Sequence, residues 1–166
     1  MLTAQELFKF LDNLKIKYQT HYHKPVFTVD QAVEVFKEFP PFGQCKNLFL
    51  KDRKKNFWLV VALFDTQIKL KDLSKIIHAH ELRFADENLL QSYLGVTPGS
   101  VTPFGLINDE KHVVNVVLDQ RLFEHQTLGF HPLTNDATTF ITPDDLQKFI
   151  SALGNNNQIL NFGELK

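Results

Sequence analysis

A single cysteine, Cys45, is present in the chain, which excludes an intrachain disulfide framework and indicates a reducing compartment. No apolar run approaches the roughly 18 residues that a membrane-spanning helix needs. The N-terminal residues MLTAQELFKFLDNL lack the basic start and the small-residue cleavage site of a signal peptide. We therefore expect a soluble, cytoplasmic protein that has no membrane partner.

An excess of charge of either sign is also absent. The chain has 18 basic and 19 acidic side chains, for a net charge of −1. This balance argues against a protein that wraps phosphates to gain its affinity, but it leaves contact with a short piece of nucleic acid open. Apolar residues make up 43% of the chain and 16 residues are Phe, which is enough for a packed core. The length fits a single domain over residues 1–166.

Helical and extended patterns follow each other without a regular β-α-β rhythm. Two capping boxes, Thr3 with Glu6 and Thr28 with Gln31, predict the starts of two helices. Apolar runs on both sides of the charged residues 53–56 predict a β-hairpin. The remaining pattern predicts strands at 16–23, 112–119 and 138–141, helices at 69–77, 86–94 and 142–153, an irregular loop at 95–105 and a turn at 154–158. This order favours an α+β domain around a mixed, mostly antiparallel sheet flanked by helices.

Two histidine pairs raise the question of a metal site. His21 and His23 lie in a predicted strand, where residues two apart share a face and can chelate a metal. His78 and His80 follow a helical pattern, in which such residues do not face each other. Neither HExxH nor paired cysteines accompany them. Solvated histidines are the better interpretation, and no metal is expected.

Cys45 and Lys46 are neighbours at the start of the predicted hairpin. A cation can lower the pKa of a thiol, but neighbours in a strand point to opposite faces, so Cys45 is interpreted as a small buried hydrophobe and not as a nucleophile. Lys46 shares its parity with Leu48 and Leu50. It either faces inward and needs a partner or a ligand, or reaches from the strand end to water, and both interpretations stay open.

Two loops have compositions that suit anions or carbonyl groups. Residues 51–55, KDRKK, form a basic hairpin turn, and such turns are usually solvated. The stretch Gly99–Pro103 lacks the Gly-Lys-Ser/Thr sequence of a P-loop, so nucleotide hydrolysis is poorly supported. Its backbone amides can instead approach a substrate closely and donate to a carbonyl or an oxyanion.

The order of several motifs carries more information than any of them alone. The chain contains, in sequence, the segments HKPVFTVDQA, CKNLFLKD, FWLVVAL, LRFADENLLQSYLGVTPGSVTPFGLIND, VVLD and GFHPLTNDATTFIT. Together they closely resemble the YbaK-like aminoacyl-tRNA deacylase family, which includes the editing domain inserted in bacterial prolyl-tRNA synthetases. The resemblance covers about residues 2–165 and is strongest to the freestanding members that hydrolyse alanyl-tRNA(Pro).

The resemblance implies a YbaK-like domain with a barrel-like sheet. It also implies a hydrolase that releases an amino acid from the 3′-terminal adenosine of tRNA without a metal, a cofactor or a covalent nucleophile. The implied catalytic residues are Lys46, Gly99 of the GxxxP loop and His131 of the G-x-H-P turn. The implied substrate-binding residues are Thr28, Asn47, Ser100, Val101, Thr102, Pro103 and Asn135. Asp136 departs from the threonine that is common at this position in alanyl-specific relatives.

The chemistry of an aminoacyl ester fits these residue types. The ester is already activated, so the enzyme has to position a water and stabilise an oxyanion. Under this hypothesis, the amides near Gly99 and Ser100 bind the oxyanion or the substrate, and Lys46 contacts the terminal phosphate, the ribose or the carbonyl. The ribose 2′-hydroxyl orients the water, and His131 orients substrate or water. Residues 51–55 are a candidate phosphate patch for the acceptor end of tRNA(Pro).

The corresponding role is correction of errors made by prolyl-tRNA synthetase, which is a possible docking partner. A pocket built for proline cannot reject the smaller alanine well, because one methylene discriminates only about 10–200-fold. A second pocket of Phe- and Val-rich strands that admits alanine and excludes proline would correct the error. The alternatives are a deacylase for cysteinyl-tRNA(Pro) or several small amino acids, a non-catalytic module that binds tRNA or the synthetase, and a binder of free amino acids.

Overall fold

The computed structural model describes residues 1–164, and Leu165 and Lys166, at the end of the predicted domain, lie outside the described residues. The helices are α1 (Ala4–Asn13), α2 (Val29–Phe36), α3 (Leu70–Ile76), α4 (Glu87–Leu94) and α5 (Pro143–Leu153). The strands are β1 (Gln19–Tyr22), β2 (Cys45–Lys51), β3 (Phe57–Leu63), β4 (Arg83–Phe84), β5 (Val114–Asp119), β6 (Leu128–Phe130), β7 (Ala137–Ile141) and β8 (Asn157–Leu160). Short 3-10 helices lie at Pro98–Ser100, Pro103–Asn108, Gln120–Glu124 and Phe162–Glu164. Within residues 1–164, no helix has the length and apolar character needed to cross a membrane.

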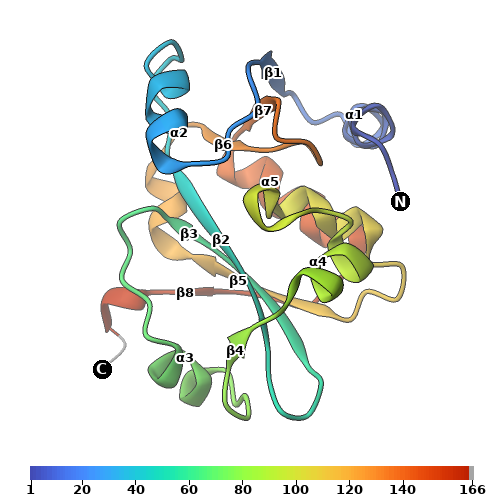
Figure 1. The fold of residues 1–166 in the computed structure, drawn as a ribbon. Coiled ribbons are helices and arrows are strands. Elements are labelled where there is room, and N and C mark those ends of the chain that lie inside the picture. Colours follow the sequence, from blue (N-terminus) through green and yellow to red (C-terminus); the bar gives the residue numbers. More distant parts are fainter. Residues whose placement is uncertain (165–166) are drawn as a thin grey trace.

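The described strands form two sheets (Figure 1). Strands β1, β7 and β6 make an antiparallel sheet in that order. The larger sheet has the order β4-β2-β3-β5-β8, with antiparallel pairing up to β3 and parallel pairing beyond it. The α+β class and the mixed, mostly antiparallel pairing are therefore confirmed. The expectation of a barrel-like sheet is wrong, because the strands form two separate ladders, linked by an isolated bridge between Gly43 and Leu128, that do not close.

The predicted hairpin, β2 and β3, lies at the centre of the larger sheet. Its turn is closed by Asp52, whose carboxylate accepts hydrogen bonds from the backbone N–H groups of Lys54 and Asn56. Every residue of β3 is buried, because both faces of this sheet are covered. One face carries Phe49 and packs into the main hydrophobic cluster, while the other carries Leu50 and packs into a smaller cluster. Both faces of β2 therefore offer buried surroundings.

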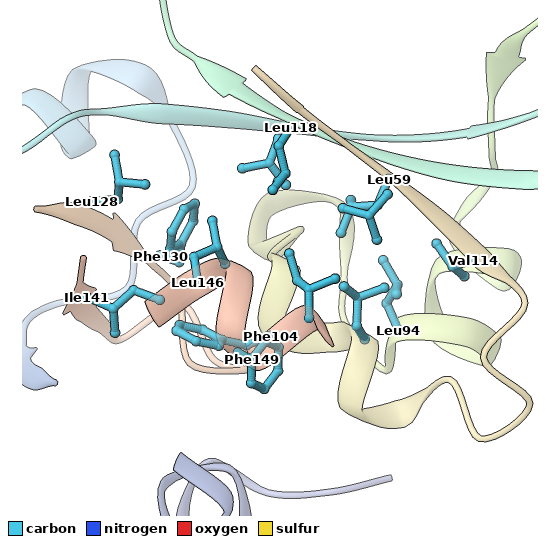
Figure 2. Packing of buried hydrophobic residues seen from close by; sticks show 14 of the residues in the cluster. Leu59, Leu94, Phe104, Val114, Leu118, Leu128, Phe130, Ile141, Leu146 and Phe149 are labelled. Carbon is cyan, nitrogen blue, oxygen red and sulfur yellow. The ribbon is translucent and has the colours of Figure 1, made fainter. Parts of the chain in front are cut away.

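The main hydrophobic cluster includes residues of both sheets and of helices α1, α4 and α5. Figure 2 shows its centre, where the rings of Phe104 and Phe149 meet edge to face with 5.5 Å between their centroids. Phe130 of β6 meets Phe104 in the same geometry at 5.9 Å. Because close-packed aromatic rings have little freedom to move, the core holds Phe130 in place.

The predicted helix starts agree with the structure. Thr28 and Gln31 form a reciprocal capping box at the start of α2. Thr3 caps α1 through its side chain, and Thr142 caps α5 with Pro143 at the first helical position. These features are local in sequence, and a serine, threonine, asparagine or aspartate cap acts through its own side chain and the next turn of backbone.

The sequence does not predict β4, β6 and β8, each of which has at most four residues. Strand β8 begins inside the segment predicted as a turn, residues 154–158. Gly154 does end α5 in the left-handed conformation, at a φ of 86°, but Asn157 already pairs with β5. This polar segment has no apolar–polar alternation of its own. It is a strand because it pairs with the buried strand β5.

Candidate active site

A pocket of about 410 Å³ opens beneath α2, at the end of the larger sheet where β2 begins. Figure 1 shows α2 next to the start of β2 and to β6, while the hairpin turn lies at the opposite end of the molecule. The pocket is bounded by α2 and the residues before it, the start of β2, the ends of β6 and β7, and single residues of two loops. The apolar part of its wall comes from Val26, Phe27, Ala32, Val33, Phe36, Phe42, Phe64 and Phe130.

Aromatic rings make the wall beneath α2 stiff. Phe42 meets Phe36 edge to face at 5.1 Å and Phe140 at 5.0 Å between ring centroids. Gly129 lies directly against these rings, because a Cβ added there would come within 2.9 Å of Phe42. Phe130 is held by the core on its other side. The wall comes mainly from α2, its flanking segments and β6, and the Val-rich strand β3, which the sieve hypothesis would include, contributes no lining residue.

Asn47 connects β2 to the Gly99–Pro103 loop. Its Nδ2 donates to the carbonyl of Val101 at 3.1 Å. Its Oδ1 is buried and has no hydrogen-bond partner among the described residues. An unpaired buried polar atom costs about 1–3 kcal/mol, so such an atom in a pocket wall indicates a position for a ligand. Asn47 therefore carries an unused acceptor within the pocket wall.

His131, predicted from the G-x-H-P turn, lines the pocket with one ring nitrogen fixed. Its Nδ1 lies 2.9 Å from the carbonyl oxygen of Ala137, and a carbonyl only accepts, so Nδ1 carries the proton. Burial lowers the pKa of His131 below its usual 6.5 and outweighs the hydrogen bond to Ala137, which raises it. The ring is therefore neutral at neutral pH, and the lone pair on Nε2 can accept a hydrogen bond from substrate or water.

This lowered pKa has a measurable consequence for stability. Because the folded protein binds the His131 proton less readily than the unfolded chain, the contribution of His131 is complete above about pH 6.5 and is lost as the pH falls through the folded pKa. We expect the urea midpoint of the wild type to fall more between about pH 7.5 and 5.5 than that of His131→Gln. His80→Gln replaces an exposed histidine, so its urea midpoint should fall by as much as that of the wild type. Equal falls for wild type and His131→Gln would contradict the prediction.

Thr138 lies in the polar Asn-Thr run after the G-x-H-P turn, which the resemblance implies as part of the pocket or its surroundings, and it lines the pocket although it was not an individual candidate. It lies in β7, and its Oγ1 is 2.9 Å from Nε2 of His23. The next residue, Thr139, points to the opposite face of the strand, where its hydroxyl lies 2.8 Å from that of Thr20. Side chains alternate along a strand, so the sequence TTFI indicates that Thr138 and Thr139 lie on opposite faces of β7. Which of the two faces lines a pocket depends on where α2 lies, and the sequence alone does not give that position.

The structure separates Lys46 from its neighbour Asn47. The Nζ of Lys46 donates to the carbonyl of Thr66, in the loop after β3, and Lys46 does not line the pocket. Neighbouring residues of a strand face opposite sides, so Asn47 points to the pocket and Lys46 away from it. The prediction that Cys45 and Lys46 do not share a site agrees with this geometry. Phe64, two residues before Thr66, does line the pocket, so Lys46 is connected to the pocket wall through this loop.

Only the first residue of the Gly99–Pro103 loop lines the pocket. A Cβ added to Gly99 would meet no atom within 4 Å, so open space faces this part of the backbone. The N–H of Ser100 donates to the carbonyl of Thr97 at 2.9 Å, so this amide is not a free donor for an oxyanion as was expected. The other four residues of the loop do not line the pocket: Ser100, Val101, Thr102 and Pro103.

The remaining candidates have mixed outcomes. Thr28 lines the pocket and caps α2 with the same side chain. Asn135 does not line it, but its backbone carbonyl accepts from the N–H of Val26 at 3.2 Å and so positions a wall residue. Cys45 lines the pocket and is half-buried. Burial, with a contribution from the charge of Asp119, raises the pKa of its thiol to about 12, so a thiolate nucleophile is not available at neutral pH.

The other predicted clusters lie apart from the pocket. Within residues 1–164, no three His, Cys, Asp or Glu side chains gather so that they could hold a metal ion. His21 packs between two phenylalanine rings, and His78 and His80 are exposed. The basic turn 51–55 lies at the far end of β2, about 20 Å from the pocket at a rise of about 3.3 Å per residue (Figure 1).

Comparison with known proteins gives a consistent result. The sequence profile of the aminoacyl-tRNA editing domain matches residues 23–149, a range that contains every residue of the pocket wall. The chain is 41% identical over 156 residues to the prolyl-tRNA editing protein ProX of Acetoanaerobium sticklandii, which covers 93% of this chain and 94% of that protein. It is 40% identical over 162 residues to the prolyl-tRNA synthetase associated domain-containing protein 1 of Mus musculus, which covers 95% of each.

A solved structure supports the same fold. A crystal structure described as a candidate trans-editing enzyme for prolyl-tRNA synthetase superposes on this chain with a TM-score of 0.73. The alignment covers 97% of this chain and 98% of the other, at 18% identity. At this level of identity the likeness concerns the arrangement of helices and strands and not the chemistry of the pocket.

Proposed function

The chain belongs to the aminoacyl-tRNA editing domain family, and from this premise we propose that it hydrolyses alanyl-tRNA(Pro) to alanine and tRNA(Pro). It would act in trans on the mischarged product of prolyl-tRNA synthetase. The observation that carries the proposal is the pocket, which combines an apolar aromatic wall with neutral polar groups and an unpaired buried acceptor. This combination suits a small apolar side chain next to an amine and an ester.

The residues of the pocket can divide the reaction between them. The apolar wall at Val26 and Phe130 takes the methyl group of alanine, while Asn47 and Gly99 lie beside the ester. The neutral ring of His131 accepts a hydrogen bond at Nε2 from the attacking water or from the ribose hydroxyl that orients it. No covalent intermediate is required, since an aminoacyl ester is already activated and the raised pKa of Cys45 disfavours a thiolate.

Single-turnover deacylation tests the proposal. The wild-type protein would be mixed in excess with alanyl-, prolyl- and cysteinyl-tRNA(Pro), each labelled on the tRNA, and the loss of ester followed over time. We expect rapid loss of alanine and little loss of proline. Loss of cysteine at the same rate would broaden the substrate to small amino acids. If all three esters are lost only at the rate of spontaneous hydrolysis, the deacylase proposal is wrong. The alternative that remains is a non-catalytic module that binds tRNA or the synthetase.

Two exposed phenylalanines at the mouth of the pocket are placed to hold the terminal adenosine. Phe27 is 74% exposed and Phe64 is 59% exposed, and both line the pocket. Stacking of a base on an aromatic ring contributes about 1–3 kcal/mol. We expect Phe27→Ala and Phe64→Ala each to raise KM for alanyl-tRNA(Pro) by about 5–100-fold with a smaller change in kcat. Phe84, which is similarly exposed on β4, is the control, and an equal effect of Phe84→Ala would contradict the assignment.

A further inference from the structure

The loop that follows β3 connects the mouth of the pocket to a second cavity. Phe64 lines the pocket, whereas the next two residues, Asp65 and Thr66, line a separate cavity of about 600 Å³. Figure 1 shows this loop between the end of β3 and helix α3. Consecutive Cα atoms are about 3.8 Å apart, so the two cavities meet within about 8 Å along the chain. A ligand that leaves the pocket over Phe64 therefore comes close to the second cavity.

The second cavity lies at the carboxyl ends of three parallel strands. Strands β3, β5 and β8 are neighbours that run parallel, and residues after each of them line the cavity. In open sheets with parallel strands, ligands bind outside the carboxyl ends of the strands. The charged side chains of the lining are those of Asp65, Lys69, Asp72 and Arg121. The topology therefore makes this cavity a suitable place for a charged part of a ligand next to the pocket.

Arg121 presents an incompletely used guanidinium group to the second cavity. Its Nη1 donates to the hydroxyl of Thr66 at 2.9 Å and lies 3.0 Å from Oδ1 of Asp65, and its Nη2 donates to Oδ2 of Asp65 at 3.4 Å. These contacts use three of the five N–H donors, and the other two have no acceptor within residues 1–164. The side chain of Asp65 is 72% exposed, so its ion pair with Arg121 lies in water and contributes little to stability. Another anion can therefore replace Asp65.

Lys46 is not available for the same task. The family resemblance implies that it contacts the terminal phosphate, the ribose or the carbonyl of the substrate. Its Nζ instead donates to the carbonyl of Thr66, and Lys46 lines neither cavity. Arg121 contacts the same residue through its hydroxyl, and 41% of the Arg121 side chain is exposed. Of the two cations that hold Thr66, Arg121 is therefore the one that a ligand can reach.

We propose that Arg121 binds the phosphate that joins the 3′-terminal adenosine of tRNA to the preceding nucleotide. The inference rests on the proposed function, in which the adenine base stacks on Phe64 at the mouth of the pocket. Only the ribose separates the base of a nucleotide from its 5′-phosphate, so a base on Phe64 brings this phosphate towards Asp65 and Arg121. The planar guanidinium can bind two phosphate oxygens through parallel hydrogen bonds, and the phosphate then replaces Asp65 as its partner.

Two esters separate phosphate binding from support of the loop. Alanyl-adenosine keeps the base, the ribose and the ester of alanyl-tRNA(Pro) but has no phosphate. We expect Arg121→Ala to raise KM for alanyl-tRNA(Pro) about 10-fold and to leave kcat and KM for alanyl-adenosine within about 2-fold. The slope of log KM against log salt concentration should fall by about 0.7, the value for one phosphate of a single strand. If Arg121→Ala impairs both esters equally, Arg121 only supports the loop and the inference is wrong.

Asp65 provides a test with the opposite sign. Asp65→Asn keeps the size of the side chain but removes the charge that competes with the phosphate, so KM for alanyl-tRNA(Pro) should fall about 3-fold. An increase in KM would contradict the inference, because the ion pair would then serve to hold the loop. Lys69→Ala is the matched control, since it removes another cation that lines the same cavity. It should change KM less than about 3-fold, and an effect equal to that of Arg121→Ala would contradict a specific role of Arg121.

Binding of free nucleotides tests the phosphate site without catalysis. AMP carries a phosphate on the 5′ oxygen of adenosine, where the tRNA chain continues. In NMR titrations, the wild type should bind AMP about 10-fold more tightly than adenosine, and Arg121→Ala should bind the two about equally. Equal affinities in the wild type would overturn the inference. A preference for AMP that depends on Arg121, in a protein that does not hydrolyse alanyl-tRNA(Pro), would overturn the proposed function and leave the phosphate site in place.

Discussion

The Lys46→Ala variant is expected to hydrolyse alanyl-tRNA(Pro) about 100-fold more slowly than the wild type in single-turnover assays, because a misplacement of about 1 Å can cost that much even when the mutated residue lies away from the chemistry. Lys46 donates to the carbonyl of Thr66. The hydroxyl of Thr66 in turn accepts from Nη1 of Arg121 at 2.9 Å and donates to the buried carboxylate of Asp119. Loss of Lys46 leaves the Thr66 carbonyl unpaired and loosens the loop that carries Phe64 to the mouth of the pocket.

Two roles for Lys46 can be separated with a truncated substrate. Alanyl-adenosine carries the ester and the ribose but no phosphate. If Lys46 holds the loop, Lys46→Ala slows both alanyl-tRNA(Pro) and alanyl-adenosine, and if its charge binds the terminal phosphate, only the tRNA ester slows. Because Nζ is bonded to a carbonyl and Lys46 does not line the pocket, we expect both esters to slow.

Lys69 provides the control for charge. It is exposed and follows the same loop, so Lys69→Ala removes a cation from this region without removing the bond to Thr66. We expect a change of less than about 3-fold, as for most surface charges. An unchanged rate in Lys46→Ala would remove Lys46 from the active site while leaving the deacylase assignment in place.

Elements fixed by local chemistry were predictable from the sequence. The capping box of Thr28 and Gln31, the N-cap Thr142 and the hairpin around Asp52 depend on residues within one turn of each other. The division into two sheets was not predictable, because it depends on which strands pair over long distances. Strand β6 has three residues and no alternation that separates it from a loop, yet its pairing with β7 places Phe130 and His131 at the pocket.

The same difference between local and long-range features decides which pocket residues were predictable. The family resemblance led to Asn47, Gly99 and His131, all of which line the pocket. It also led to Lys46, whose parity with Leu48 and Leu50 places it on the other face of β2. Parity could not decide between these faces, because both are covered. Phe36 and Phe42 were missed because they line a cavity only where α2 and the segment before β2 meet the ends of β6 and β7.

The Asn47→Ala variant is expected to lose at least about 100-fold in kcat/KM for alanyl-tRNA(Pro). The substitution removes the unpaired acceptor from the pocket and also releases the Val101 carbonyl, so the loop that carries Gly99 loses its bond to β2. The loss of one part-buried hydrogen bond should cost about 1–3 kcal/mol in the free energy of unfolding, which is measured by urea denaturation. The effect on catalysis should therefore exceed what partial unfolding explains.

The Asn115→Ala variant is the matched control for Asn47→Ala. Its Nδ2 donates to the carbonyl of Phe57 at 3.1 Å, the same distance as in the bond from Asn47 to Val101, and it lies in the same sheet but outside the pocket. Asn115→Ala should therefore match Asn47→Ala in lost stability but keep kcat/KM within about 3-fold of the wild type. If both variants lose activity in proportion to stability, Asn47 supports the fold only. If Asn47→Ala alone loses activity, the Asn47 side chain is part of the machinery that binds the ester.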